Sequence, residues 1–199
     1  MKNLWRGFVK FWNEDSLRSW LVFLFIILPL VFILIKFVFF PALNLISGSS
    51  QTLVIIETGS MHHDGSLGNI LYFPVNFNNY WNQAKDWYIQ NNITKEQFEK
   101  FPFKTGMEIG DIIVLTKKGK IDIGDIIVFD AGEKRPIIHR VISIKNENNK
   151  RIYSTKGDAN PSQLPFELSI EENQIIGKAV ARLPRLGLPK VIAAKIFNI

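Results

Sequence analysis

Hydrophobic residues follow two patterns along the chain: one long uninterrupted run near the N-terminus, and many short runs after it. The long run covers residues 20–40 and contains a single charged residue, Lys36. A helix of this length rises about 30 Å, which matches the hydrocarbon thickness of a bilayer. The pattern predicts a transmembrane helix over residues 20–40, with Trp20 as an interfacial anchor and Pro29 as a kink.

The short apolar runs after residue 50 are typical of β-strands bounded by turns. Two copies of Gly-Asp-Ile-Ile-Val begin at Gly110 and Gly124, and each predicts a strand entered through a Gly-Asp turn. Asp111 and Asp125 are therefore turn-capping residues first and candidates for chemistry second. Further strands are expected over residues 53–56, 136–142, 151–156 and 175–183. This spacing predicts an all-β domain of short, curved sheets.

Two stretches depart from the strand pattern. Residues 66–104 are rich in Asn and aromatic residues. We expect a partly helical insertion whose aromatic side chains pack together; docking on lipid or covering a groove is the alternative. Residues 187–199 mix apolar residues with Lys190 and Lys195, which indicates an amphipathic C-terminal tail. The expected organisation is an N-terminal segment over 1–19, a transmembrane helix over 20–40, a β domain over 41–186 and the tail.

Composition and charge limit the classes of binding partner that we expect for this chain. The 199 residues carry a formal charge of +6, with a pI of about 9.5 and no cysteine. The lysines are scattered, so a nucleic acid is not an expected partner, whereas an anionic lipid surface suits the excess of positive charge. The lack of cysteine excludes disulfides, thiol catalysis and cysteine-ligated metals.

The flanks of the hydrophobic run predict its orientation. Lys2, Arg6, Lys10 and Arg18 precede it, which favours a cytoplasmic N-terminus and an extracytoplasmic β domain. The run is long for a cleaved signal peptide, and no small-x-small site follows it closely, so a permanent anchor is favoured.

A candidate nucleophile follows the first predicted strand, in Glu57-Thr58-Gly59-Ser60-Met61. Gly59 lets the backbone bend sharply without a Cβ clash, which leaves the Ser60 hydroxyl exposed on a turn. Attack on an amide needs a positioned oxygen, a base near neutral pKa and donors for the oxyanion. Ser60 can supply the oxygen, but serines in turns are common, so the motif depends on a base elsewhere.

The chain has three histidines that could act as this base. His62 and His63 follow the candidate nucleophile too closely for a rigid serine–histidine hydrogen bond. We expect them to be solvated loop residues, with a weak metal site that includes Asp64 as the alternative. His139 lies inside an apolar strand, where it is either a structural histidine or the base. Asp158, at the end of the next strand, could lie beside His139 and stabilise its imidazolium, or could cap a turn.

Together these blocks resemble type I signal peptidase of the archaeal and endoplasmic-reticulum branch. The matching segments are the apolar run, Thr58-Gly59-Ser60-Met61, residues 124–129, His139-Arg140-Val141, Lys156-Gly157-Asp158-Ala159-Asn160 and residues 176–180. The resemblance implies a mainly β fold, with an all-β catalytic domain of the signal-peptidase type on a single N-terminal transmembrane helix. It also implies a serine endopeptidase, without cofactor or metal, that removes signal peptides from exported preproteins after small-x-small sites.

The same resemblance implies a role for each matching residue. Ser60 would be the nucleophile, His139 the general base, and Asp158 the group that orients or stabilises His139. Thr58 and the N–H of Ser60 would form the oxyanion hole. The implied partners are the signal peptides of secretory preproteins, the lipid bilayer and the protein-export machinery. The implied location is the cell membrane, or the endoplasmic reticulum membrane in a eukaryote.

Two features depart from the family's pattern. The family often carries a second aspartate about five or six residues after the first, where this chain has Gln163 and Leu164. Glu167 is the nearest downstream carboxylate and is a possible substitute. The insertion over residues 66–104 also lengthens the connection that follows the serine block.

Two alternatives therefore remain open. One is a catalytically silent, membrane-anchored β scaffold that binds export partners. The other is a serine–lysine peptidase of related fold, with Lys134 or Lys145 as the base in place of His139.

Overall fold

The computed structural model describes residues 17–63 and 76–197. The chain separates into two compact units, one ending at Ile46 and the other beginning at Ser47. The predicted segment over residues 1–19 lies almost entirely outside the described residues.

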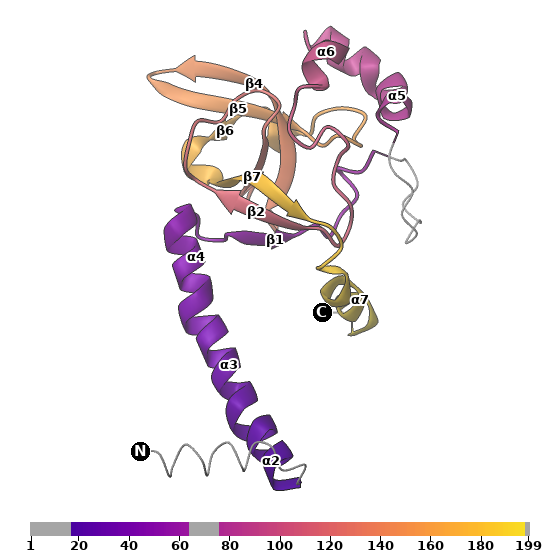
Figure 1. The fold of residues 1–199 in the computed structure, drawn as a ribbon. Coiled ribbons are helices and arrows are strands. Elements are labelled where there is room, and N and C mark those ends of the chain that lie inside the picture. The colour runs from indigo at the N-terminus through magenta and orange to yellow at the C-terminus, as the bar shows by residue number, and fades with distance from the viewer. Residues whose placement is uncertain (1–16, 64–75, 198–199) are drawn as a thin grey trace. The chain divides into compact units, whose positions relative to one another are not determined.

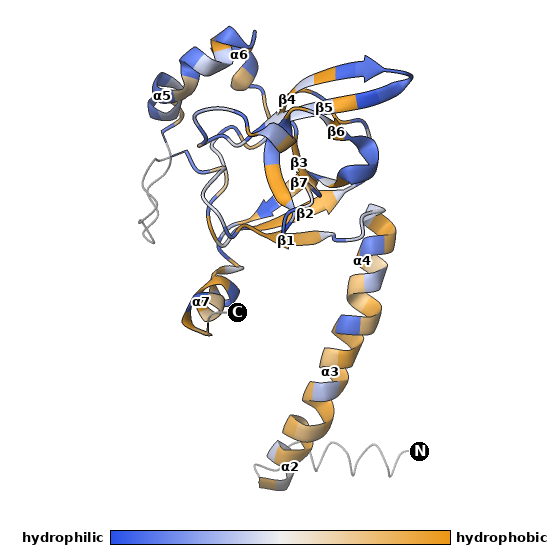
Figure 2. Cartoon of the chain, turned by 180° about the vertical axis from the view of Figure 1, so that it is seen from behind, coloured by the Kyte–Doolittle hydropathy of each residue, from blue (hydrophilic) through white to orange (hydrophobic). Residues whose placement is uncertain are grey.

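The first unit is an apolar helix that continues into Ser47. It consists of α2 (Leu17–Val22), a π-helical turn (Phe23–Ile27), α3 (Leu28–Leu34), a second π-helical turn (Ile35–Phe39) and α4 (Phe40–Ser47). Within it, Trp20–Ser47 is a 28-residue helix that is long and apolar enough to cross a membrane, and Figure 2 colours most of it as hydrophobic. The helix thus extends beyond the predicted end at residue 40.

Each π-helical turn ends two residues before a proline, Pro29 or Pro41. A proline has no N–H to give to the carbonyl four residues back, and that carbonyl lies inside the π-helical turn in both cases. The missing hydrogen bond accounts for the local widening of the helix at both places.

The second unit is built on one curled, seven-stranded antiparallel sheet (Figure 1). Its strands are β1 (Leu53–Ile55), β2 (Ile112–Thr116), β3 (Ile126–Phe129), β4 (Ile137–Glu147), β5 (Lys150–Lys156), β6 (Ile170–Glu171) and β7 (Ile175–Leu183). Their order across the sheet is β1-β2-β7-β3-β4-β5-β6. Two short 3₁₀ turns, Pro165–Glu167 and Glu172–Gln174, flank β6. The mainly β fold class is therefore confirmed.

The two Gly-Asp turns enter β2 and β3 as predicted. Oδ2 of Asp111 accepts the N–H of Glu108 at 2.9 Å, and Oδ2 of Asp125 accepts the N–H of Asp122 at 2.9 Å. Both aspartates therefore cap their turns. All four residues of β3 are buried, because Ile126 and Val128 pack in one hydrophobic cluster, whereas Ile127 and Phe129 pack in another.

The described part of the insertion contains α5 (Phe77–Gln90) and α6 (Lys95–Phe98). Its first residues, up to 75, lie outside the described chain. The aromatic side chains turn inward: an aromatic cluster of Tyr80, Trp81, Tyr88 and Phe98 is buried together with Ile93 and with Ile142 of β4. The insertion is thus partly helical, and its main aromatic residues pack inward rather than facing a lipid surface.

A β-bulge in β4 sets the register of the β4–β5 hairpin. From the turn outward, the strands pair in one register as far as Ser143 with Ser154. Beyond Ile142 the register moves by one residue, so that Arg140 pairs with Lys156. The extra residue, Ile142, is 5% exposed and packs into the aromatic cluster. A shift by one residue changes which side chains face each other at the far end of the hairpin.

Over its described residues, the predicted tail is the helix α7 (Leu188–Phe197). It begins against the ends of β1 and β2. The N–H of Gly187 donates to the carbonyl of Gly110 at 2.8 Å, and a Cβ on Gly187 would stand 2.7 Å from Cγ2 of Ile55. Val191 of this helix is buried.

Candidate active site

Ser60 lies on a short turn beyond the end of β1. The N–H of His62 donates to the carbonyl of Gly59 at 3.0 Å and closes this turn. The carbonyl of Ser60 accepts the N–H of Ala159 at 2.8 Å, and the next residue, Met61, is fully buried in the core. The backbone of the candidate nucleophile is thus fixed from two directions while its side chain stays partly accessible.

The hydroxyl of Thr58 lies on the same turn. Its Oγ1 is 3.4 Å from Oγ of Ser60, which is long for a hydrogen bond. Thr58 is exposed. The two hydroxyls therefore lie close to each other at an accessible surface.

His139 of β4 forms a buried pair with Glu167. Nδ1 of His139 contacts Oε1 of Glu167, and the two side chains are 4% and 0% exposed. Oε2 of Glu167 accepts the N–H of Leu164 at 2.6 Å, which fixes the carboxylate. A carboxylate held on Nδ1 sets the orientation of the ring and favours the tautomer whose Nε2 can accept a proton.

The turn over residues 157–160 lies next to both candidates. A Cβ on Gly157 would stand 2.7 Å from Nε2 of His139, so this nitrogen faces the backbone of Gly157. Two residues further on, the N–H of Ala159 binds the carbonyl of Ser60. The structure thus brings Ser60 and His139 to one turn. Within the described residues, no recorded polar contact joins the Ser60 hydroxyl to the His139 ring.

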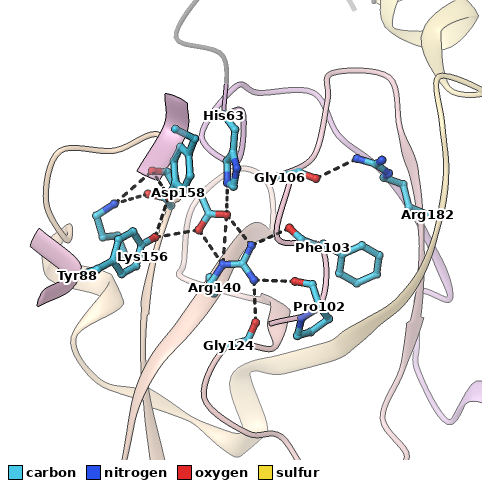
Figure 3. Close-up of polar contacts among 12 residues, drawn as sticks. His63, Tyr88, Pro102, Phe103, Gly106, Gly124, Arg140, Lys156, Asp158 and Arg182 are labelled. Atoms are coloured by element: carbon cyan, nitrogen blue, oxygen red, sulfur yellow. Dashed lines mark hydrogen bonds and ion pairs between the residues drawn. The ribbon is translucent and has the colours of Figure 1, made fainter. Parts of the chain in front are cut away.

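Asp158 differs from the sequence-based expectation, because its carboxylate does not contact His139. It accepts Nη2 of Arg140 at 2.7 Å, Nε2 of His63 at 2.8 Å and the hydroxyl of Tyr88 at 3.1 Å (Figure 3). The contact expected for this aspartate is made by Glu167 instead.

The bulge at Ile142 explains the difference. Without the extra residue, the pairing that begins at the β4–β5 hairpin turn would continue in the same register and place His139 opposite Asp158. With the shift, Arg140 pairs with Lys156 and the His139 ring lies against Gly157, while Asp158, in the turn after β5, contacts Arg140.

Arg140 is fully buried, and all five of its N–H groups have acceptors. Besides Asp158, it donates to the carbonyls of Pro102 at 2.8 Å, Gly124 at 2.9 Å and Phe103 at 3.0 Å (Figure 3). Burial alone would raise the pKa of Asp158, but the Arg140 charge and the His63 contact hold it well below its usual range. The ion pair and the hydrogen bonds of Arg140 therefore connect two loops, at residues 102–103 and at Gly124, to the turn beside Ser60.

The expectation of solvated histidines is wrong for His63, which is 3% exposed. Its ring stacks on Tyr80 with centroids 3.4 Å apart, and burial lowers its pKa despite the contact with Asp158. Nδ1 of His62 lies 2.7 Å from Oε2 of Glu108. In the described part of the chain, no group of three or more His, Cys, Asp or Glu side chains could hold a metal ion, and Asp64 lies outside that part.

The insertion also contacts the turn that bears Asp158. The hydroxyl of Tyr80 donates to the Asp158 carbonyl at 3.2 Å. Nζ of Lys156 donates to the Gly157 carbonyl at 3.0 Å and lies 5.0 Å from the ring centroid of Trp87. Burial lowers the pKa of Lys156 to about 8, although Asp158 and Glu167 act in the opposite direction.

Gln163 and Leu164 stand at the position of the family's second aspartate, and neither takes the place of a carboxylate there. Nε2 of Gln163 donates to Oγ of Ser154 at 2.6 Å and to the carbonyl of Thr155 at 2.7 Å, which attaches this loop to β5. The Leu164 side chain is exposed. Glu167 reaches His139 because the 3₁₀ turn after Pro165 folds back toward the sheet.

The alternative lysine bases are both exposed: Lys134 lies between β3 and β4, and Lys145 lies near the hairpin turn. In the described residues, neither has a recorded contact with the Ser60 turn. No role for Arg140 was predicted from the sequence. The sequence feature that could have indicated such a role is the charge of Arg140, because an arginine inside an apolar strand, here over residues 137–142, requires a buried acidic partner.

The fold and the site define a mainly β domain that follows an apolar, membrane-length helix, with a serine on a turn and a carboxylate-paired histidine on a strand that both adjoin the turn over residues 157–160. No family model matches the chain. Its sequence is similar to the signal peptidase complex catalytic subunit SEC11 of Komagataella phaffii, at 24% identity over 171 residues that cover 78% of this chain and 74% of the relative.

Two further relatives have similar names. The SEC11 subunit of Yarrowia lipolytica is 22% identical over 167 residues, which cover 80% of this chain and 73% of that protein. The human subunit SEC11C is 33% identical over 92 residues, 42% of this chain and 48% of that protein. These similarities confirm the resemblance to type I signal peptidases of the archaeal and endoplasmic-reticulum branch.

Proposed function

We propose that this chain is a membrane-bound signal peptidase, a serine endopeptidase that removes signal peptides from exported preproteins after small-x-small sites. The observation that carries the proposal is the buried His139–Glu167 pair, whose imidazole faces Gly157 in the same turn that binds the Ser60 carbonyl through Ala159, in a chain similar to SEC11 catalytic subunits. A buried histidine with a fixed carboxylate partner is suited to general-base catalysis.

In the proposed reaction, the Ser60 oxygen attacks the carbonyl carbon of the peptide bond while its proton passes to Nε2 of His139. The imidazolium then gives this proton to the leaving amine, and water releases the acyl group by the same route. Glu167 keeps the ring oriented and stabilises its positive charge. The N–H of Ser60 and the hydroxyl of Thr58 donate to the oxyanion.

Asp158 has a positioning role in this scheme. Its ion pair with Arg140 fixes the turn whose Ala159 N–H holds the Ser60 carbonyl. The carboxylate therefore acts on the nucleophile through the backbone, and Glu167 takes the part that the sequence resemblance implied for Asp158.

A substrate segment can bind in extended form at the edge of the sheet. β1 is an edge strand in the described fold and leads directly to Ser60. Pairing with β1 would bring the scissile bond to the nucleophile through main-chain hydrogen bonds, and shallow pockets would admit only small side chains.

The bilayer is the proposed setting for this reaction. Ser60 follows the last residue of the apolar helix, Ser47, by 13 positions. A short tether keeps the groove near the membrane surface, where a signal peptide emerges, and raises the effective substrate concentration. We propose a cytoplasmic N-terminus, an extracytoplasmic β domain and association with the export machinery; the membrane is that of the cell, or of the endoplasmic reticulum in a eukaryote.

The test is cleavage of a preprotein by the purified full chain in proteoliposomes. Cleavage should occur when alanine stands at the third and first positions before the cut, and should stop when phenylalanine replaces the alanine next to the cut. Ser60→Ala and His139→Ala should each abolish it, whereas Ser169→Ala, which alters an exposed serine, should not. Full activity of Ser60→Ala would remove that serine from the mechanism.

The same experiment separates the enzyme from a silent scaffold. A scaffold would cleave none of these preproteins in either detergent or vesicles. Cleavage that survives in His139→Ala but is lost when Lys134 or Lys145 is changed to methionine would instead favour the serine–lysine mechanism.

A further inference from the structure

Helix α7 presents an apolar face that the described domain does not cover. One side of the helix faces the domain through Val191, which is 6% exposed. On the outer side, Ile192 is 51% exposed, and Ile196 and Phe197 are each 70% exposed. Since residues of a helix advance by about 100° each, these three side chains share one outward arc.

Lysines border this arc on both sides. Lys190 lies next to Phe197 around the helix, Lys195 lies next to Ile192, and both lysines are exposed. The last residue of β7, Leu183, is 40% exposed, and Leu186 in the connection that follows is 65% exposed. We call these five apolar residues and two lysines the α7 surface. An apolar strip between cations is the pattern of a helix that lies in a membrane interface.

The chain itself brings a bilayer close to this domain. The membrane-length helix ends at Ser47, whose carbonyl accepts the N–H of Lys117 at 3.0 Å at the end of β2. The other end of β2 adjoins α7, because Gly110 binds Gly187. A five-residue strand rises about 17 Å, so the entry point of the chain and the start of α7 are one short strand apart.

We propose that the α7 surface binds the headgroup region of a bilayer that contains anionic lipids. The apolar side chains enter the acyl boundary, and Lys190 and Lys195 contact the lipid phosphates. The ten described residues of the helix rise about 15 Å, about half the thickness of a hydrocarbon core, and their apolar face suits a position in the interface.

This contact would also fix the depth of the candidate nucleophile. Nζ of Lys190 lies 3.4 Å from Oε1 of Glu57, which is bound on its other oxygen by Arg135. Glu57 directly precedes the turn with Thr58 and Ser60. The positioning of Ser60 for catalysis rests on the proposed function, whereas the lipid contact does not depend on it.

The test uses the full chain, whose lack of cysteine allows one labelled position at a time. An Ile196→Cys variant carries the environment-sensitive probe NBD, and Lys150→Cys, at a side chain that is 71% exposed in the β4–β5 hairpin, is the matched control. Both are reconstituted into vesicles of phosphatidylcholine, alone or mixed with phosphatidylglycerol, with or without spin-labelled lipid as a quencher.

The probe at 196 should shift to the blue and be quenched by the labelled lipid in the mixed vesicles, and less so in high salt or in phosphatidylcholine alone. The probe at 150 should remain water-exposed throughout. Adding Lys195→Glu should lower the insertion equilibrium at 196 by at least about fivefold, because each cation near an anionic surface contributes roughly that factor. A Ser60→Ala background should change none of this, which separates the lipid contact from peptidase activity.

Three results would overturn the proposal. In the first, the probe at 196 behaves like the probe at 150 in both kinds of vesicle. In the second, shielding occurs only at a high protein-to-lipid ratio, which assigns the surface to a second copy of the chain. In the third, insertion is equal with and without phosphatidylglycerol, which removes the anionic headgroup from the contact.

Discussion

Changing Glu167 to glutamine removes the charge that the structure places on Nδ1 of His139 while keeping the size of the side chain. Both side chains are almost fully buried, so water screens their interaction weakly. At an effective dielectric constant of about 20, two unit charges about 4 Å apart attract each other by roughly 4 kcal/mol. That attraction is present only when the imidazolium forms, so its loss falls on the transition state and should lower kcat by about 10³-fold.

The assay is single-site cleavage of a preprotein in proteoliposomes, with kcat and KM determined separately. Glu167→Gln should lower kcat by the stated factor and leave KM nearly unchanged, because Glu167 is buried behind the histidine and is not expected to touch the substrate. Glu167→Asp should also lose activity, since one methylene less withdraws the carboxylate from Nδ1 of His139. The thermal midpoint of each variant shows whether it still folds.

Asp158→Asn provides the contrast. Asp158 neutralises a fully buried Arg140, and breaking a buried ion pair on one side typically costs about 3–5 kcal/mol of folding free energy. This variant should therefore lose stability first and activity as a consequence. A Glu167→Gln enzyme that keeps more than about a tenth of its kcat, beside a stably folded Asp158→Asn enzyme that loses about 10³-fold, would refute the assignment and restore Asp158 as the partner of His139.

Two other predictions concern the same turn. Gly157→Ala should lower kcat at least tenfold with the fold retained, because its Cβ would stand 2.7 Å from Nε2 of His139. Parallel measurements of activity and of thermal melting would detect this loss. An unchanged kcat would contradict the close approach of Gly157 to His139. His63 has a pKa lowered from 6.5 by burial, so its contribution to stability is present above pH 6.5 and is lost as the pH falls through the folded-state pKa. His63→Gln, which can still donate to Asp158, should flatten the loss of unfolding free energy below pH 6.5 by up to about 1.4 kcal/mol per pH unit, and an unaltered slope would exclude His63 as its source.

Much of the fold could be predicted from periodicity. An apolar run with one charge indicates a membrane-length helix, and the repeated Gly-Asp-Ile-Ile-Val sequences indicate two strands with capped turns. The helix continues beyond the predicted span to Ser47, because a π-helical turn accommodates Pro41 and residues 40–47 remain helical.

The site was predictable only in part. Ser60 and His139 are distinguished by local sequence, a hydroxyl after a strand and a histidine inside an apolar one, and the structure places them at one turn. The partner of His139 depends on strand register, and a bulge is hard to recognise in a run such as Val141-Ile142-Ser143. The contacts of the insertion with Asp158 join residues about 70 positions apart, which no local pattern encodes.

The bulge at Ile142 affects how relatives of this protein should be compared. An additional residue inside a strand reverses the face of the sheet to which every later side chain of that strand points. Two acidic residues at the same sequence distance from a shared glycine–aspartate pair can therefore face opposite sides of the sheet in two homologous proteins. Two catalytic acids are then equivalent only if they lie on the same face of the hairpin. A sequence comparison that counts positions without locating such insertions would transfer the role of one acid to the other.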